Sequence, residues 1–389
     1  MQVDIIPLPL HRSGSQKQSI APSTWRSRVT RLVSVSSVAI MLGLAPSAWA
    51  QHFYLQTNLV SDVPGLAAVT HLPLVNPWGL TRSATSPWWV ADNGAGVSTL
   101  YTGAGAPLGL VVTIPVGMGG TPPSAPTGTV FNGIATDFLV DTGKPARFLF
   151  VSEDGTISGW NSGTTAVVKV DHTGAAVYKG VTLGQRSGAN FLYAANFSGG
   201  MVEVYDNAFN PVSLGVGAFR DHHLPRGFAP FNVQNINGMI FVAFAKQDDQ
   251  KKDEVAGPGL GFVDAFDTNG KLLMRLEHGH WFNAPWGIAW APANFGRFSN
   301  MLLVGNFGSG KIAAFDPTHG HFRGMVRGDN RRPLAIDGLW ALSFGNDAGA
   351  GPSTTLFFTA GIEDEAHGLF GTITPLPDKG DGDNDADDQ

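Results

Sequence analysis

Residues 305–311 read GNFGSGK and have the spacing of a phosphate-binding loop, in which two glycines and a lysine enclose a nucleotide. In such a loop, backbone N–H groups at the start of a helix hold the phosphates, and a serine or threonine after the lysine holds Mg²⁺. Here Ile312 takes that last place and a strand-like run follows it. An internal copy keeps Asn196 and the glycine turn but has Met201 instead of the lysine. We therefore predict a β-hairpin and no nucleotide binding.

Side-chain oxygens offer a second chemistry, which is the coordination of a hard cation such as Ca²⁺. Asparagine, aspartate and glutamate recur directly after short apolar runs, as in WWVADN, FLFVSED and MLLVGNF. The candidate metal ligands are Glu153, Asn196, Asn306 and Asp337. The same asparagines also suit tight turns, because asparagine tolerates left-handed backbone geometry. Both interpretations stay open at this point.

The elements that must position these residues come from a repeat of about fifty residues. Each copy opens with a small turn motif, continues with a strand that ends in a polar turn, and closes with a hairpin strand. The position shared by the opening motifs falls at Gly79, Gly128, Gly180, Asn232, Gly287 and Gly338. Most copies add a further short run, which makes about four strands each. Six copies of four strands predict an all-β fold, a six-bladed β-propeller.

The ends of the repeat suggest how the ring closes. The sixth copy stops without an outer strand, whereas residues 52–62 form a run that precedes the first copy and belongs to no blade. Pairing this N-terminal strand with the last blade would leave no open sheet edge. We therefore expect the propeller to occupy residues 51–377.

The two termini have compositions of their own. Residues 1–50 contain a basic stretch, an apolar run and a small-residue site, which is typical of a secretory signal peptide cleaved after Ala50. This predicts a secreted or periplasmic protein with no membrane span in the mature chain. Residues 378–389 are acidic and predict a disordered tail. Removing the five basic and one acidic side chains of residues 1–50 changes the formal net charge from −6 to −10. Nucleic acid is therefore not expected as a partner, and we expect a monomer.

Several motifs also resemble those of a known family. The segments LVNPWGL, EDGTISGWN, APFNVQNI, NAPWGIA, LLVGNF and DGLWALSFG are similar to those of an uncharacterised family of secreted bacterial propeller proteins. The resemblance covers nearly the whole chain after residue 55. It implies a six-bladed propeller and export but no established activity. More distantly, the repeat is similar to NHL repeats and to the gluconolactonase and regucalcin propellers, a resemblance that implies a divalent cation in the central channel.

In a propeller of this kind, the opening motifs and the turns after the second strands lie around one mouth of the central channel. The candidate binding residues at this mouth are Asn76, Trp78, Asp92, Asn93, Glu153, Asp154, Asn196, Trp286, Asn306, Asp337, Trp340, Glu363, Asp364 and His367. The three tryptophans either pack between blades or stack on a ligand. Two carboxylates about 4 Å apart repel by roughly 4 kcal/mol at an effective dielectric near 20. If Glu153 meets Glu363 or Asp364, a cation, a lysine or arginine, or a retained proton must balance them.

Histidine spacing suggests zinc, since the pairs at 278–280 and 319–321 would each place two imidazoles on one side of a strand. The repeat assigns the two pairs to opposite faces, so we do not expect a joint site. The chain has no cysteine, and therefore no thiol nucleophile or thiolate metal site. It also lacks the G-x-S-x-G and H-E-x-x-H motifs.

Two classes of function fit these features. The first is a binding scaffold whose channel mouth recognises a small molecule, a glycan or a surface protein. The second is a divalent-metal-dependent lactonase or esterase, in which a channel cation such as Ca²⁺ polarises an ester carbonyl. No cofactor other than this cation is implied.

Overall fold

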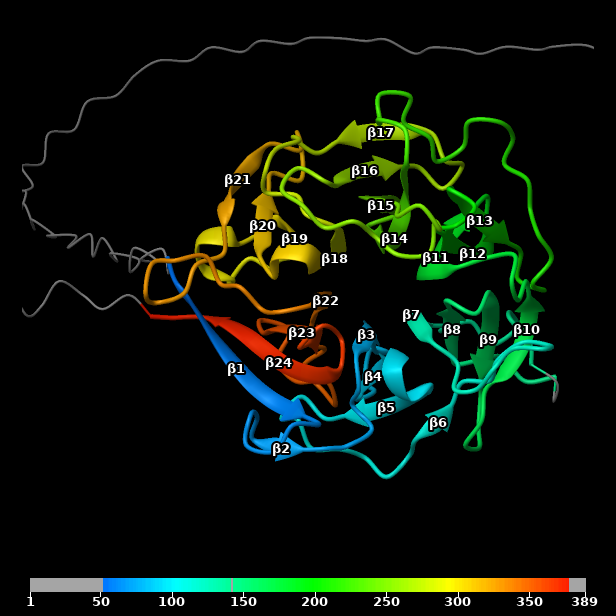
Figure 1. Ribbon diagram of the computed structural model, residues 1–389, viewed down its shortest axis with the longest axis horizontal. Coiled ribbons are helices and arrows are strands. Elements are labelled where there is room, and N and C mark those ends of the chain that lie inside the picture. Colours follow the sequence, from blue (N-terminus) through cyan, green and yellow to red (C-terminus); the bar gives the residue numbers. More distant parts are fainter. Residues whose placement is uncertain (1–51, 141–142, 378–389) are drawn as a thin grey trace, which may run out of the picture. The chain divides into compact units, whose positions relative to one another are not determined.

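The computed structural model describes residues 52–140 and 143–377, which form 24 β-strands and three short 3-10 helices. The strands make six sheets that stand around a common centre like the blades of a propeller (Figure 1). This confirms the predicted six-bladed fold. The expected signal segment and acidic tail lie outside the described residues.

Four of the blades contain four antiparallel strands each, which run from the centre outwards. The first is β3 (Pro77–Thr81), β4 (Trp88–Asp92), β5 (Val97–Tyr101) and β6 (Val112–Thr113). The second is β7 (Pro126–Phe131), β8 (Phe148–Ser152), β9 (Thr156–Trp160) and β10 (Val167–Asp171). The fourth is β14 (Phe228–Ile236), β15 (Met239–Lys246), β16 (Phe262–Phe266) and β17 (Leu272–Arg275). The fifth is β18 (Pro285–Trp290), β19 (Leu302–Asn306), β20 (Ile312–Phe315) and β21 (Phe322–Met325).

The other two blades depart from this pattern. The third has only three strands, β11 (Tyr178–Arg186), β12 (Ala189–Asn196) and β13 (Met201–Tyr205). The sixth joins both ends of the propeller, and its strands are β22 (Leu339–Phe344), β23 (Leu356–Ile362), β24 (His367–Pro375), β1 (Tyr54–Ser61) and β2 (Val69–Thr70). In this blade β1 pairs antiparallel with β24, from Tyr54 opposite Pro375 to Ser61 opposite Leu369 (Figure 1). The predicted closure by the N-terminal strand is confirmed.

A steric demand explains the glycine that opens four of the six repeats. A Cβ atom on Gly79 would lie only 2.4 Å from the carbonyl oxygen of Thr127 on the next innermost strand. The innermost strands therefore approach backbone to backbone around the channel, and glycine permits the approach. In the sixth blade the shared position is Ala341 and not Gly338, because the pairing of β22 with β23 begins at Leu339, as that of β3 with β4 begins at Pro77.

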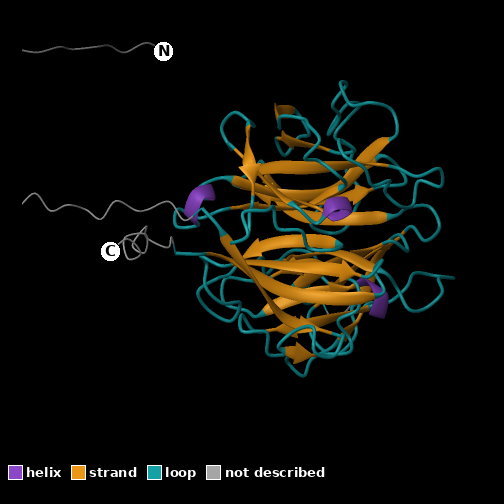
Figure 2. Cartoon of the chain, turned by 60° about the vertical axis from the view of Figure 1, so that its left-hand side comes forward, coloured by secondary structure: helices purple, strands orange, loops and turns teal. Residues whose placement is uncertain are grey.

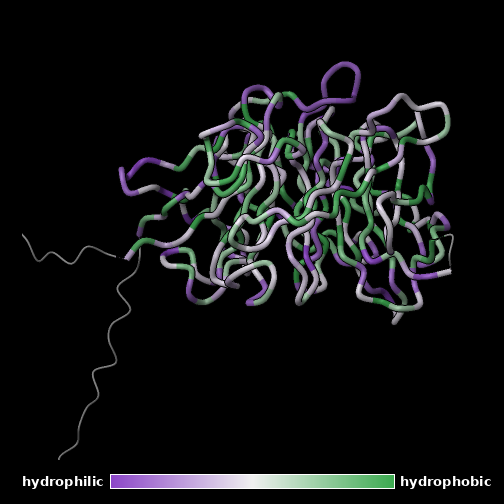
Figure 3. The backbone as a smooth tube through the Cα atoms, turned by 90° about the horizontal axis from the view of Figure 1, so that it is seen from below, coloured by the Kyte–Doolittle hydropathy of each residue, from purple (hydrophilic) through white to green (hydrophobic). Residues whose placement is uncertain are grey.

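The loops gather at the ends of the strands (Figure 2), while the apolar stretches run through the interior (Figure 3). The 3-10 helices η1 (Asn93–Ala95), η2 (Gly296–Phe298) and η3 (Phe307–Ser309) lie in such loops. The segment that resembled a phosphate-binding loop is β19, η3 and β20, which confirms the predicted hairpin. Within the described residues, no helix is both long and apolar enough to cross a membrane.

Candidate functional site

Large side chains from the innermost strands, and one from the turn after β12, close the channel below its mouth. We call Trp78, Phe197, Phe231, Trp286 and Trp340 the aromatic layer; all five are buried. Trp78 stacks on Trp340, and Trp286 meets both rings edge-on at 6.1 and 5.9 Å between centroids. Beneath the layer lies a small polar cavity of about 40 Å³. The tryptophans therefore pack against one another at the centre of the propeller, which fits the packing alternative and not the ligand-stacking one.

Lys179 takes the place in β11 that Trp78 takes in β3, since both follow the first residue of the innermost strand. Its side chain is fully buried, and its Nζ lies 4.9 Å from the centroid of Trp78. The ammonium pairs with Glu153 at 2.5 Å and with Asp253 at 3.4 Å. A cation over aromatic faces and beside carboxylates is stabilised by both. Burial alone would lower the pKa of Lys179, but the carboxylates of Glu153 and Glu254 outweigh it and raise that pKa.

Hydrogen bonds link this lysine to the neighbouring blades around the mouth. Trp340 Nε1 donates to Asn76 Oδ1 at 3.2 Å, and Asn76 Nδ2 donates to Glu365 Oε1 at 3.0 Å and to Asn93 Oδ1 at 3.3 Å. Asn93 Nδ2 in turn donates to Glu153 Oε2 at 3.1 Å. The network joins side chains that are far apart in the sequence and brings Asn76, Asn93 and Glu153 together.

Carboxyl groups outnumber the buried ammonium at this place. We call Glu153, Lys179, Asp253, Glu254 and Glu365 the mouth cluster. Burial raises the pKa of Glu254 to about 8, and the negative charges of Glu365 and Asp253 add to this effect. Burial also raises the pKa of Glu365, helped by Glu153 and Asp253. Burial favours the neutral form of Glu153 too, but Lys179, with a smaller effect from Lys252, holds the pKa of Glu153 below its usual value.

A left-handed turn presents Glu365 to the mouth. Glu363, Asp364 and Glu365 have φ of 54°, 52° and 65°, a region that residues other than glycine rarely adopt. Glu363 and Asp364 are exposed, and the backbone N–H of Glu363 is held by Asp337 Oδ2 at 2.8 Å. The carboxyl group that shares the mouth with Glu153 is therefore Glu365, and not Glu363 or Asp364. Lys179 supplies the balancing charge that such a meeting requires.

Asparagines expected at the mouth serve the turns of their own blades instead. Asn196 Oδ1 accepts from Gly199 N at 2.9 Å, and its Nδ2 donates to Glu203 at 2.7 Å. The Oδ1 atom of Asn306 accepts from the backbone N–H of Asn283 at 2.9 Å, and its Nδ2 donates to a backbone carbonyl at 3.1 Å. These two residues fit the turn interpretation of their sequence pattern.

Three aspartates and one histidine from the expected set are also engaged elsewhere. The carboxyl group of Asp92 is fully buried against Thr99, and burial raises its pKa well above the usual range. Asp154 accepts from the backbone N–H of Ala125 at 2.8 Å. Asp337 holds the turn described above. His367 lies 2.7 Å from Asp62 on the chain that follows β1, and this contact raises its pKa.

Metal coordination finds little support in this arrangement. Across residues 52–140 and 143–377, no three side chains of histidine, aspartate or glutamate are placed to hold a metal ion. Of the four candidate ligands, Glu153 pairs with Lys179, whereas Asn196, Asn306 and Asp337 bind groups within their own blades. The mouth therefore holds an ammonium, whereas the resemblance to the gluconolactonase and regucalcin propellers implied a divalent cation.

The two histidine pairs do not lie on opposite faces, and that expectation was wrong. Glu277 directly precedes the pair at 278–280. Its backbone N–H donates to the carbonyl oxygen of Gly320 at 2.8 Å, and its Oε2 lies 3.6 Å from Nδ1 of His321. The outer end of the fourth blade and the β20–β21 hairpin meet here. His319 and His321 are exposed and stack with 6.0 Å between ring centroids.

Sequence reasoning missed four members of the mouth cluster. Lys179 carried a usable signal, because a charged residue there replaces the tryptophan, phenylalanine or threonine of the other copies. Glu365 directly follows Asp364, which was named. Asp253 and Glu254 belong to the long connection between β15 and β16, which has no counterpart in the repeat and carried no signal.

Comparison with known proteins gives a family but no activity. No family model matches the chain. The chain is 30% identical over 333 residues to "Uncharacterized protein L690" of Acanthamoeba polyphaga mimivirus, covering 81% of this chain and 84% of that protein. This relative is viral, whereas the sequence motifs had implied a bacterial family.

Solved structures agree on the fold alone. A protein of unknown function from Bacteroides thetaiotaomicron matches with a TM-score of 0.50 and 11% identity, over 82% of this chain and 76% of that one. Virginiamycin B lyase from Staphylococcus aureus matches with a TM-score of 0.45 and 13% identity, over 83% of this chain and 99% of that one. The chain belongs to the family of the mimivirus protein, a family whose members named here are uncharacterised.

Proposed function

We propose that the protein is a binding protein whose channel mouth holds a positively charged group of its ligand. The observation that carries this proposal is the charge of the mouth cluster, where four carboxyl groups gather around the single buried ammonium of Lys179. An excess of carboxyl groups in a partly buried place favours a cationic ligand.

The protonation of the cluster supports the same conclusion. Glu254 and Glu365 hold their protons more tightly than free glutamates because they are buried near other negative charges. An ammonium or guanidinium group placed between them would take over the role of those protons. Charge-assisted hydrogen bonds to carboxylates are among the strongest in proteins. The formal net charge of −6 also favours the approach of a cation.

Hydrolysis is the less favoured function. A metal-dependent lactonase or esterase needs a cation that polarises the substrate carbonyl. At the mouth, Glu153 is bound by Lys179 and Asn93, and its two oxygens are both engaged. The arrangement supports recognition of a charged group better than coordination of a metal.

Isothermal titration calorimetry with spermidine tests this proposal, with citrate as the anionic probe. We expect spermidine to bind and citrate not to bind. Glu365→Gln should weaken spermidine binding about tenfold or more, since a hydrogen bond to a charged group contributes about 1.5–3 kcal/mol. The matched control is Glu363→Gln, which removes a charge from the same turn but at an exposed side chain. Equal effects of the two variants, or binding of Ca²⁺ that Glu153→Gln abolishes, would contradict the proposal.

A further inference from the structure

The third blade leaves the outer edge of β13 partly open. In each of the other five blades a fourth strand pairs with the outer edge of the third strand. In the third blade, β13 is the last strand of the sheet. The chain begins such a strand, because Val212 N donates to Val204 O at 2.7 Å and Pro211 bridges to Tyr205. After Val212 it turns away towards the fourth blade, where Phe219 N donates to Gly270 O at 2.8 Å.

Backbone groups of β13 are left facing this gap. Residues two apart in a strand direct their backbone groups to the same side. Since Val204 bonds outwards to Val212, the N–H and C=O groups of Val202 also point outwards. The described part of the chain supplies no backbone partner for Val202. An open strand edge of this kind is a template for another strand.

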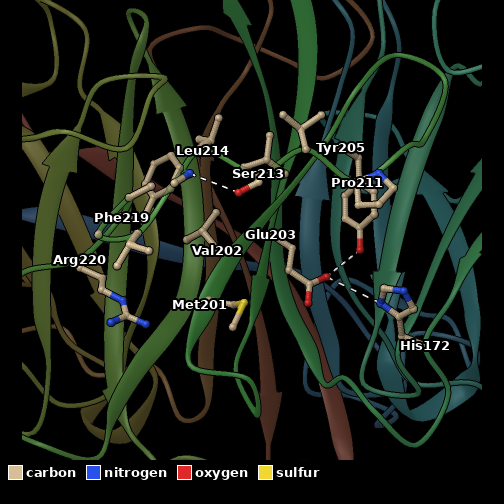
Figure 4. A pocket seen from close by; sticks show the side chains of 16 residues that line it. His172, Met201, Val202, Glu203, Tyr205, Pro211, Ser213, Leu214, Phe219 and Arg220 are labelled. Atoms are coloured by element: carbon tan, nitrogen blue, oxygen red, sulfur yellow. Dashed lines mark hydrogen bonds and ion pairs between the residues drawn. The ribbon is translucent and has the colours of Figure 1, made fainter.

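A groove of about 640 Å³ runs along this edge (Figure 4). One wall is β13, with Met201, Val202 and Glu203, and the other is the loop that carries Leu214 and Phe219. Met201 is 47% exposed although it is apolar. The groove therefore offers apolar side chains beside unpaired backbone groups.

A fixed negative charge lies at one end of the groove. The carboxylate of Glu203 accepts hydrogen bonds from Tyr178 at 2.5 Å, Tyr205 at 2.6 Å and Asn196 at 2.7 Å. His172 Nδ1 lies 3.8 Å from Glu203, and both side chains line the groove (Figure 4). These bonds hold Glu203 in one position, where a basic side chain could pair with it.

We propose that the β13 groove binds an extended polypeptide segment, which adds the missing fourth strand to the blade. Its backbone would pair with Val202, its apolar side chains would lie against Leu214 and Phe219, and a basic side chain would lie near Glu203. Addition of a strand to an open sheet edge is a common way in which proteins recognise peptides. The site is separate from the mouth cluster and does not depend on the function proposed for it.

The test uses a fluorescein-labelled peptide with the sequence KLLMRL, measured by fluorescence anisotropy on the full chain. This sequence is residues 271–276, which contain β17, the outer strand of the neighbouring blade. The control peptide has the same sequence with N-methyl groups on alternate amides, so that it cannot donate those hydrogen bonds. Loss of the hydrogen bond that a peptide N–H donates to the Val202 carbonyl should weaken binding about fivefold or more. Equal binding of the two peptides, or no binding of either, would overturn the proposal.

Protein variants give a second arm of the test. Val202→Pro removes the outward N–H group, and edge strands tolerate proline. Val202→Thr keeps that group and nearly the same shape. We expect the proline variant to bind the peptide at least tenfold more weakly than the threonine variant does. Equal affinities overturn the proposal, and so does a dimer that dissociates in Val202→Pro, because a second copy would then be the occupant. If the proline variant does not fold, the N-methylated peptide decides.

Discussion

Replacing Lys179 with methionine should destabilise the protein strongly near pH 7.5 and much less near pH 4. Methionine keeps most of the apolar contact with Trp78 but removes the ammonium that lies 2.5 Å from Glu153. In the native protein, burial opposes the charge on Glu153, and Lys179 overcomes this and lowers its pKa. Without the lysine, Glu153 carries an uncompensated charge at neutral pH and becomes neutral only as the pH falls.

The size of the effect follows from the geometry. Two unit charges 2.5 Å apart attract by about 7 kcal/mol at an effective dielectric near 20, before the cost of burying them is counted. Removing one partner of a buried pair costs about 3–5 kcal/mol in measured cases. We therefore expect the free energy of unfolding to drop by about 3–5 kcal/mol at pH 7.5. Near pH 4 the drop should be smaller, since a protonated Glu153 carries no charge.

Urea denaturation at both pH values measures this difference. The double variant Lys179→Met with Glu153→Gln should recover much of the lost stability at pH 7.5, because it removes the unpaired charge. A loss of equal size at pH 7.5 and pH 4, with no recovery in the double variant, would refute the electrostatic reasoning. Lost packing would then explain the effect.

Three further predictions follow from single features. The raised pKa of Glu254 means that the folded state binds its proton more tightly, so stability should fall as the pH rises from about 4.5 to about 8. The slope from this group is at most about 1.4 kcal/mol per pH unit, and Glu254→Gln should reduce it in urea titrations. Gly79→Ala should lower the free energy of unfolding by about 1–3 kcal/mol, since its Cβ would lie 2.4 Å from a carbonyl oxygen. Gly109→Ala, whose Cβ meets nothing within 4 Å, is the control. Intact-mass analysis of exported protein should show cleavage after Ala50, and an uncleaved chain would contradict export.

The propeller could be predicted from the sequence because its blades share one steric demand. The innermost strands pack backbone to backbone, so glycine recurs at the same place in the repeat, as at Gly79. The sixth copy shows where this reasoning fails. There Ala341 occupies the position, and the nearby Gly338 has φ of 57° in a turn that serves another purpose. The pairing of β22 with β23 begins at Leu339, after this glycine, and the sequence motif carries no sign of that.

The candidate site could be predicted only in part. Asn76, Asn93 and Glu153 were found because they follow or precede strands in the repeat, whose ends must meet around the channel. Lys179 was missed because the repeat suggested a packing residue at that place. Glu254 could not have been found, since it lies in a connection that has no counterpart in the other blades. Which side chains turn inwards depends on contacts between blades, and these are not local in the sequence.

A crystal structure of the protein grown with spermidine tests the central claim most directly. We predict density for an ammonium group at the channel mouth, within hydrogen-bond distance of Glu365 and Glu254, with Lys179 still paired to Glu153. Spermidine bound only at other places, or a metal ion bound by Glu153 with Lys179 displaced, would contradict the account.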